Sequence, residues 1–178
     1  MKRVILAASL AVALAGTSAQ AGSIGVGAFG GLSIPIVQSD VKQGSMFGLR
    51  VPIKLVPMIT VEPYYASSKL GDAEEVILGT TYSRQGFDGT AFGANVLLTM
   101  GGPVQFYPFA GIGQTKLERT GTDLSLTTYN LGMGLGISPA PKISVHIRGE
   151  LAAAMDGETS RKFANATVGL SYALFSAP

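Results

Sequence analysis

The segment from Met46 to Leu55 has two faces of opposite chemistry, and this alternation limits what the chain can fold into. Its odd-numbered positions, beginning with Phe47, are aromatic or aliphatic, whereas its even-numbered positions include Arg50 and Lys54. Because a β-strand directs successive side chains to opposite sides, the segment predicts a strand with one apolar and one cationic face. The question is then whether the apolar face packs against a protein core or against lipid.

The same alternation recurs along the chain, with Gly and Pro spread between the segments and no clear helical periodicity. The predicted strands cover residues 23–34, 46–55, 59–69, 89–100, 104–117, 125–138, 142–155 and 163–175. Their lengths match the roughly 9–11 residues that a tilted strand needs to cross a bilayer. The sequence therefore predicts eight membrane-spanning strands.

Short and long connections alternate strictly between these strands. The short ones are 56–58, 101–103 and 139–141, and the long polar ones are 35–45, 70–88, 118–124 and 156–162. Bacterial outer-membrane barrels have this pattern, with short periplasmic turns and long external loops. The longest loop, 70–88, contains an apolar Val76-Ile77-Leu78 core and predicts either an extra strand pair above the membrane or a partner surface.

The three short turns predict how the strands pair. The expected partners beside the turns are Leu55 with Ile59, Met100 with Val104, and Ser138 with Lys142. Each register keeps apolar residues opposite apolar residues, whereas a shift of one residue would mix the two faces. In the last hairpin, large polar residues then face glycines: Ser144 opposite Gly136, His146 opposite Gly134, and Arg148 opposite Gly132. Glycines opposite bulky polar groups favour a crowded lumen over a solvated surface.

We predict that the less apolar face lines the lumen of a membrane barrel. Its charged and titratable members are Arg50, Lys54, Glu62, His146, Arg148 and Glu150. Buried charges persist only when they are paired, and the predicted register places Glu62 diagonal to both Arg50 and Lys54. The alternative is a soluble β-barrel or sandwich with the apolar face inside.

Residues 1–21 have the features of a secretory signal peptide: a basic start, a 12-residue apolar run, and small residues at Ala19 and Ala21. We expect cleavage after Ala21 and a single domain over residues 22–178. Without Lys2 and Arg3, the 13 basic residues become 11 and equal the 11 acidic ones. We therefore expect no nucleic-acid partner.

The segment Phe106-Tyr107-Pro108-Phe109-Ala110-Gly111-Ile112-Gly113 resembles the aromatic-Pro-aromatic-x-Gly-x-Gly strand of small outer-membrane β-barrel proteins. That family includes the membrane domain of outer-membrane protein A. The resemblance implies an all-β, eight-stranded antiparallel up-and-down transmembrane β-barrel in a Gram-negative outer membrane, with a plugged or nearly plugged lumen. It also implies contact with outer-membrane lipid and insertion by the barrel insertion machinery. Family members usually end on an aromatic residue that points at lipid, whereas Phe175 falls on the parity opposite to Tyr172 and Leu174.

Ser144, His146 and Glu150 are the residue types of a hydrolase and share one face of a predicted strand. Some eight-stranded outer-membrane barrels are lipid A deacylases that use these three residue types. Here the order is Ser-x-His, unlike the His-x-Ser-Asn of those enzymes, and residues two apart on a strand lie about 7 Å from each other. We therefore predict no catalytic residue, with a lipid-modifying hydrolase on Ser144 and His146 as an alternative.

The luminal charges also permit a narrow gated channel for small solutes, although eight strands enclose space only for side chains. One histidine and no cysteine give no support to a metal site, and no cofactor is expected. We predict a monomeric protein of the cell outer membrane with a structural or interaction role and an external-loop partner that the sequence does not identify. A soluble periplasmic barrel that binds a small apolar ligand is the remaining alternative.

Overall fold

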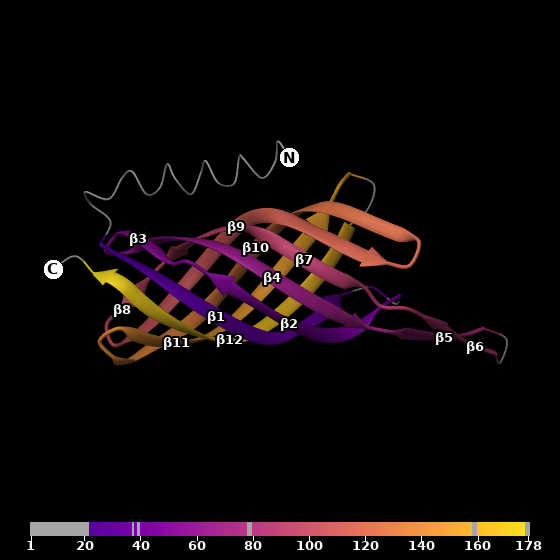
Figure 1. Cartoon of the computed structure of the whole chain (residues 1–178), viewed down its shortest axis with the longest axis horizontal. Coiled ribbons are helices and arrows are strands. Elements are labelled where there is room, and N and C mark those ends of the chain that lie inside the picture. Colours follow the sequence, from indigo (N-terminus) through magenta and orange to yellow (C-terminus); the bar gives the residue numbers. More distant parts are fainter. Residues whose placement is uncertain (1–21, 37, 39, 78–79, 158–159, 177–178) are drawn as a thin grey trace.

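The computed structural model describes residues 22–36, 38, 40–77, 80–157 and 160–176. They form an antiparallel barrel from which a two-stranded hairpin projects (Figure 1). The expected signal peptide, residues 1–21, lies outside the described residues. No helix within the described part of the chain is long and apolar enough to cross a membrane.

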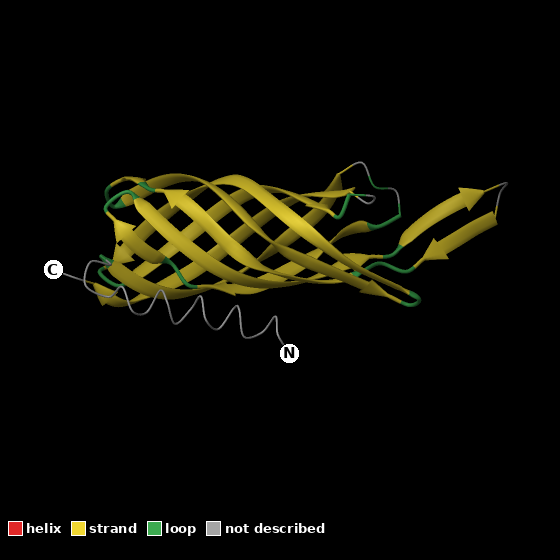
Figure 2. Cartoon of the chain, turned by 90° about the horizontal axis from the view of Figure 1, so that it is seen from above, coloured by secondary structure: helices red, strands yellow, loops and turns green. Residues whose placement is uncertain are grey.

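Ten elements form the barrel sheet. They are β1 (Ser23–Ile36), β2 (Lys42–Arg50), β3 (Ile53–Val56), β4 (Ile59–Gly71), β7 (Asp88–Leu98), β8 (Met100–Gly101), β9 (Val104–Arg119), β10 (Thr122–Ala140), β11 (Ile143–Met155) and β12 (Ser160–Ser176). Since β3 continues β2 and β8 continues β7, the barrel has eight strands in chain order, and β12 closes it by pairing with β1 (Figure 2). The predicted eight-stranded antiparallel barrel is confirmed.

Proline divides the second barrel strand into β2 and β3. Pro52 has no N–H to donate, so the regular ladder stops at this residue. The neighbouring backbone groups remain paired: Val51 N–H donates to the Pro63 carbonyl at 2.9 Å, and Gly25 N–H donates to the Pro52 carbonyl at 2.9 Å. These two bonds link the interrupted strand to its neighbours on both sides.

The hairpin between β3 and β4 has the predicted register over most of its length, with Lys54 opposite Thr60. An irregularity beside the turn pairs Val56, and not Leu55, with Ile59. The irregularity does not alter the predicted division of the two strands into a luminal face and an outer face.

The register predicted for the next short hairpin is wrong by two residues. Met100 lies opposite Phe106, and not opposite Val104, and Gly101 lies opposite Gln105. Gly101 has a φ of 104°, a left-handed conformation that favours glycine, so the strand pair extends one residue further before the turn.

The register between β10 and β11 also differs from the prediction by two residues. His146 lies opposite Gly136, and not opposite Gly134. The ladder is irregular around Pro139, which lacks an N–H and cannot continue the regular pairing. Because a shift of two residues keeps every side chain on its own face, the predicted division into two faces holds.

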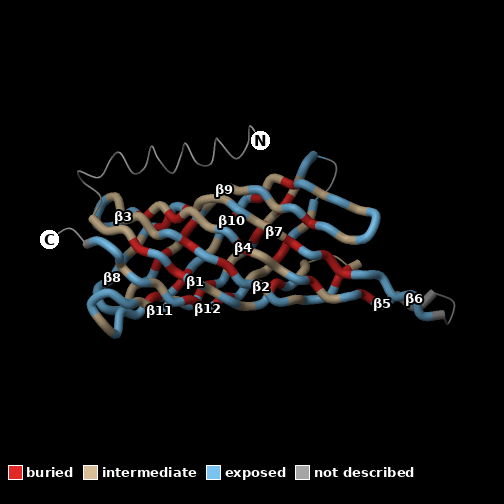
Figure 3. Tube along the Cα trace, in the orientation of Figure 1, coloured by how far each residue is buried: buried red, intermediate tan, exposed pale blue. Residues whose placement is uncertain are grey.

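The apolar face of the barrel points outward, as β10 shows. Its alternate residues from Tyr129 to Ile137 are between 52% and 64% exposed, whereas Thr128 and Asn130 are 3% and 6% exposed. Buried and exposed residues alternate in the same way along much of the barrel wall (Figure 3). The soluble alternative with an apolar interior is therefore wrong, and the outer surface suits lipid.

The last strand ends near an exposed aromatic residue, Phe175. The sequence pattern placed Phe175 on the face opposite to Leu174, and this prediction is wrong. The ladder between β1 and β12 shifts at Ile24 and Gly25, whose partners are Phe175 and Ala173. This irregularity leaves both Leu174 and Phe175 on the exposed surface, at 49% and 71%.

The longer connections lie at one end of the barrel, which we call the loop end, and the three short turns lie at the other, the turn end (Figure 1). The predicted loop 70–88 contains β5 (Ala73–Ile77) and β6 (Thr80–Arg84), which confirms an extra strand pair beyond the barrel (Figure 2). The predicted loop 118–124 is instead a tight turn. β9 continues to Arg119 and β10 begins at Thr122, with Gly121 at a φ of 78° between them.

Leu131 tests the direction of the outer face, because it lies near the middle of β10 and is 64% exposed. Leu131→Arg is expected to lower the free energy of unfolding by about 2–4 kcal/mol, the cost of a cation on the lipid-facing midplane of a barrel. The measurement is urea unfolding of the protein inserted in phospholipid vesicles, with Leu131→Met as the volume-matched control. Equal stability of both variants would mean that this face is solvated by water.

Candidate functional site: the barrel lumen

An apolar cluster occupies the loop end of the lumen. Its members are Val41, Leu70, Phe87, Leu117, Leu126, Ala152, Ala154 and Phe163, and Leu124 packs against them. Phe87, Leu117 and Leu126 are each 1% exposed. We call this group the loop-end cluster. It fills the loop end of the lumen with apolar side chains.

Charged residues hold Phe87 in this cluster from the loop side. The guanidinium carbons of Arg119 and Arg161 lie 4.3 Å and 4.7 Å from the centre of the Phe87 ring. Asp40 accepts two hydrogen bonds from Arg161, at 3.0 Å and 2.8 Å, and lies 3.7 Å from Nη1 of Arg119. The Arg161 hydrogen bond, with the charges of both arginines, holds the pKa of Asp40 below its usual value, although burial acts in the opposite direction.

Sequence reasoning missed this arrangement because its residues fell in predicted loops or beyond the predicted strand ends. Arg119 has the same parity as Leu117, and Arg161 has the same parity as Phe163. Extending the alternation of these two strands by two residues would have placed both arginines inside. No sequence signal identifies Asp40 as their partner.

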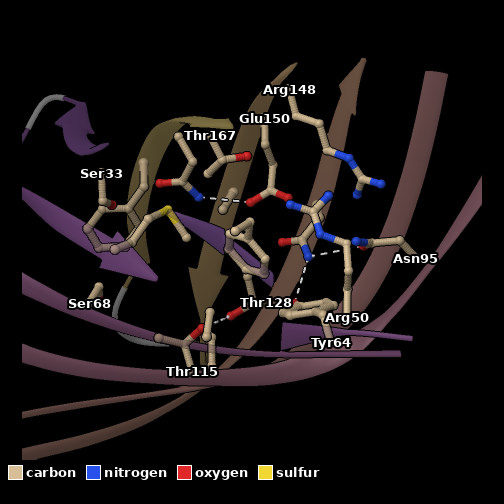
Figure 4. Close-up of a pocket in the computed structure, with 18 of the residues that line it drawn as sticks. Ser33, Arg50, Tyr64, Ser68, Asn95, Thr115, Thr128, Arg148, Glu150 and Thr167 are labelled. Carbon is tan, nitrogen blue, oxygen red and sulfur yellow. Dashed lines mark hydrogen bonds between the residues drawn. The ribbon is translucent and has the colours of Figure 1, made fainter. Parts of the chain in front are cut away.

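A small cavity with both polar and apolar lining, drawn in Figure 4, borders the loop-end cluster, because Leu70, Leu117 and Phe163 are among its lining residues. Its volume is about 80 Å³, enough for several water molecules. Asn130 Nδ2 donates to Tyr64 OH at 2.7 Å and lies 3.4 Å from Asn95 Oδ1. Thr115 and Thr128 are joined by a hydrogen bond of 2.6 Å between their hydroxyls. We call this space the central cavity.

Glu150, one of the predicted luminal residues, lines the central cavity and accepts a hydrogen bond from Asn165 Nδ2 at 2.8 Å. Arg50, Glu62 and Arg148 also line this cavity. Its charged side chains are therefore two cations and two carboxylates, so their formal charges balance.

The strongest polar contact of the lumen joins Arg148 to Glu62. Nη1 and Nη2 of Arg148 donate to the two carboxylate oxygens, the second at 2.8 Å, and the side chains are only 7% and 2% exposed. Glu62 lies on β4 and Arg148 on β11, which are four strands apart in the ring of eight, so the pair crosses the lumen. Such a bidentate, charge-assisted pair fixes both side chains.

The predicted partners of Glu62 were Arg50 and Lys54, and this part of the prediction is wrong. The prediction considered only neighbouring strands, whereas a barrel of eight strands is narrow enough for Arg148 to reach the opposite wall.

Glycines of β10 make room for the rings that surround Arg148. Arg148 Nε donates to Tyr107 OH at 3.0 Å, and its guanidinium lies 4.9 Å and 5.4 Å from the centres of the Tyr107 and Phe109 rings. A Cβ on Gly134 would lie 2.5 Å from the Tyr107 ring, and one on Gly132 would lie 2.5 Å from the Phe109 ring. The predicted pairs differ from the observed ones, in which Arg148 lies opposite Gly134 and His146 opposite Gly136, but glycines still face large polar groups.

His146 continues the hydrogen-bonded chain toward the turn end. Its Nδ1 lies 3.0 Å from Tyr107 OH and its Nε2 lies 2.8 Å from Ser171 Oγ. Since Arg148 only donates, Tyr107 OH accepts from Arg148, and its own hydrogen is available for Nδ1 of His146. In that arrangement Nε2 carries the histidine hydrogen and donates to Ser171, and the imidazole is neutral.

The structure does not bring together the three residues of the hydrolase alternative. Ser144 is hydrogen-bonded to Ser138 at 2.8 Å, and Glu150 is hydrogen-bonded to Asn165. Ser171, and not Ser144, contacts His146. The other ring nitrogen of His146 meets a phenol that is bound to an arginine, where a hydrolase needs a carboxylate to stabilise the imidazolium.

Arg50 and Lys54 lie near the turn end of the lumen. Arg50 is 3% exposed, its guanidinium lies 4.3 Å over the Phe29 ring, and its Nη1 has no hydrogen-bond partner. Both cations line a second cavity of about 190 Å³, which we call the turn-end cavity. No group of three or more His, Cys, Asp or Glu residues in the described part of the chain could hold a metal ion.

Asp40→Asn is expected to lower the free energy of unfolding at neutral pH by about 1–3 kcal/mol, the contribution of hydrogen bonds to a charged group. Because the pKa of Asp40 is lowered by folding, this stabilisation is present above the unfolded-state pKa and disappears as the pH falls through the folded-state value. Urea unfolding at several pH values should therefore show the wild type converging on the variant in acid. The exposed Asp123→Asn is the control, and a constant difference at all pH values would contradict the assignment.

The Glu62–Arg148 pair predicts strong coupling between two substitutions. Glu62→Gln or Arg148→Gln alone leaves a buried charge unpaired and is expected to cost about 3–5 kcal/mol. The double variant removes both charges and should cost much less than the sum, which a double-mutant cycle of unfolding free energies measures. Lys116→Gln, on the exposed face, is the control. Additive losses would show that the two side chains do not interact.

The chain matches the family model of the outer membrane protein beta-barrel domain over residues 4–173. Neisserial surface protein A is similar in structure, with a TM-score of 0.62 and 13% identity over 84% of this chain and 96% of its own. The N-terminal β-barrel domain of Pseudomonas aeruginosa OprF has a TM-score of 0.54 and 15% identity over 85% of this chain and 98% of its own.

Yersinia pestis outer membrane protein Ail in a phospholipid bilayer nanodisc has a TM-score of 0.53 and 17% identity over 85% of this chain and 99% of its own. At these identities, the structural likeness shows the fold alone. No curated protein matches the chain in sequence. Because the family model covers nearly the whole chain, the protein belongs to the outer membrane β-barrel domain family and resides in the outer membrane of a Gram-negative cell.

Proposed function

We propose that this protein is a closed outer-membrane barrel with a structural or interaction role, and that it is neither an open pore nor an enzyme. The observation that carries the proposal is that the lumen is occupied at two separate levels. The loop-end cluster supplies a dry apolar layer, and the Glu62–Arg148 pair crosses the lumen below it. An ion would have to lose its hydration at the first level and displace a buried ion pair at the second.

The outer surface supports a monomer in direct contact with outer-membrane lipid. Exposed apolar side chains occur on all eight barrel strands, among them Leu32, Phe47, Tyr65, Phe92, Ile112, Leu131, Ile147 and Leu170. The exposed Leu174 and Phe175 at the end of β12 supply an apolar C-terminal strand for the barrel insertion machinery. Export requires the signal peptide of residues 1–21, which is removed to leave residues 22–178 as the barrel domain.

The loop end supplies the interaction role. The β5–β6 hairpin extends beyond the barrel wall (Figure 2), and external loops on a rigid scaffold are where recognition usually resides. Ail, which has the same kind of fold, is named as an attachment invasion locus protein.

A narrow gated channel is the second candidate function. The observation that favours it is the presence of a cavity on each side of the Glu62–Arg148 layer, with both residues lining both cavities. Opening this pair alone would join the two spaces. The loop-end cluster would still have to move for solutes to pass.

Conductance in planar lipid bilayers distinguishes the two candidates. The closed-barrel proposal predicts no discrete conductance steps for the wild type or for Arg148→Gln. It predicts steps only when Arg148→Gln is combined with Phe87→Ala, which weakens the loop-end cluster as well. Lys116→Gln, which changes one exposed charge, is the matched control and should remain silent. Steps from the wild type would overturn the proposal, and steps from Arg148→Gln alone would favour the gated channel.

A further inference from the structure

The turn-end cavity contains an excess of positive charge that the central cavity does not share. Among the described residues, four basic side chains line it, from Arg50, Lys54, Lys142 and Arg148, and one carboxylate, that of Glu62. The formal charge of these described side chains is therefore +3, from four cations and one anion. The central cavity, by comparison, is lined by two cations and two carboxylates. A cavity whose walls carry charges of one sign concentrates ions of the opposite sign.

Arg50 lines the turn-end cavity as well as the central cavity and has an unsatisfied donor. Only 3% of the residue is exposed, and its Nη1 has no hydrogen-bond partner. A buried, unpaired donor on a charged group costs free energy unless some acceptor satisfies it. Glu62 does not serve as this acceptor: its two oxygens accept from Arg148, and Nη1 of Arg50 has no hydrogen bond to them.

The position and size of the cavity restrict the ligand. Lys142 lies in the turn between β10 and β11, and Lys54 lies on β3 beside the turn into β4, so the cations surround the mouth at the turn end. Short turns of such barrels face the periplasm. The cavity volume of about 190 Å³ admits a group of phosphate size, and neutral donors such as Gln105 also line it.

We propose that the turn-end cavity is a binding site for a small oxyanion of the phosphate class that enters from the periplasmic side. Arg50 donates to the anion from the base of the cavity, and Lys54 and Lys142 attract and hold it at the mouth. Arg148 is already engaged by Glu62 and contributes charge without moving. The phosphate group is either a free anion or the headgroup of a phospholipid in the inner leaflet.

The test uses the full barrel domain in octyl glucoside micelles, which contain no phosphate, and inorganic phosphate as the probe. Calorimetric titration should show saturable binding to the wild type. Lys54→Gln combined with Lys142→Gln should weaken this binding at least about tenfold, the effect of losing one or more charge-assisted contacts. Lys116→Gln combined with Lys162→Gln removes the same charge from exposed positions nearer the loop end and should leave binding unchanged.

No saturable binding to the wild type, or an equal loss in both double variants, would overturn the proposal. Arg50→Gln should also weaken binding, and the two lysine variants keep the test decisive if that buried substitution prevents folding. Repeating the titration in phosphatidylglycerol nanodiscs identifies the source of the phosphate group. A tenfold weaker apparent affinity there means that lipid headgroups already occupy the site, whereas an unchanged affinity means that the natural occupant is a free anion.

Discussion

The structure depends on one constraint: in the hydrocarbon part of a membrane, every backbone N–H and C=O must find its partner within the protein. An open sheet cannot meet this requirement, because its edge strands have unpaired groups. Pairing of β12 with β1 removes the edges, and the carbonyl of Pro52 and the N–H of Val51 keep their partners where the regular ladder is interrupted. Once the sheet is closed, its apolar face has only lipid to contact and its polar face has only the lumen.

The narrow lumen then determines which side chains can coexist. Eight strands leave space for side chains and little else, so a bulky group on one wall requires a small residue opposite. Gly132 and Gly134 accommodate the aromatic rings that surround Arg148, and Arg148 in turn reaches Glu62 on the far wall. The ion pair, the rings and the glycines therefore form one arrangement. The balanced central cavity and the cationic turn-end cavity lie on either side of it.

Period-2 alternation was sufficient to predict the eight strands and the division into two faces, because both depend only on side-chain direction along one strand. The strand registers, which depend on turn geometry, were harder to predict from the sequence. The left-handed conformation of Gly101 and the extension of β10 to Ala140 each go with a register that differs from the prediction by two residues. Contacts across the lumen could not be predicted from neighbouring strands, so the partner of Glu62 was assigned wrongly. The pairing of Asp40 with Arg161 joins residues 121 positions apart and leaves no local pattern.

The central claim is that the apolar outer face of this barrel contacts lipid and not water. The chain has no cysteine, so single cysteines at Leu131, Met133 and Leu135 can each carry a spin label without background. Power-saturation measurements in vesicles then compare collisions with oxygen, which dissolves in lipid, and with a water-soluble nickel complex. The account predicts high oxygen access and low nickel access at all three positions. High nickel access near the middle of β10 would contradict it.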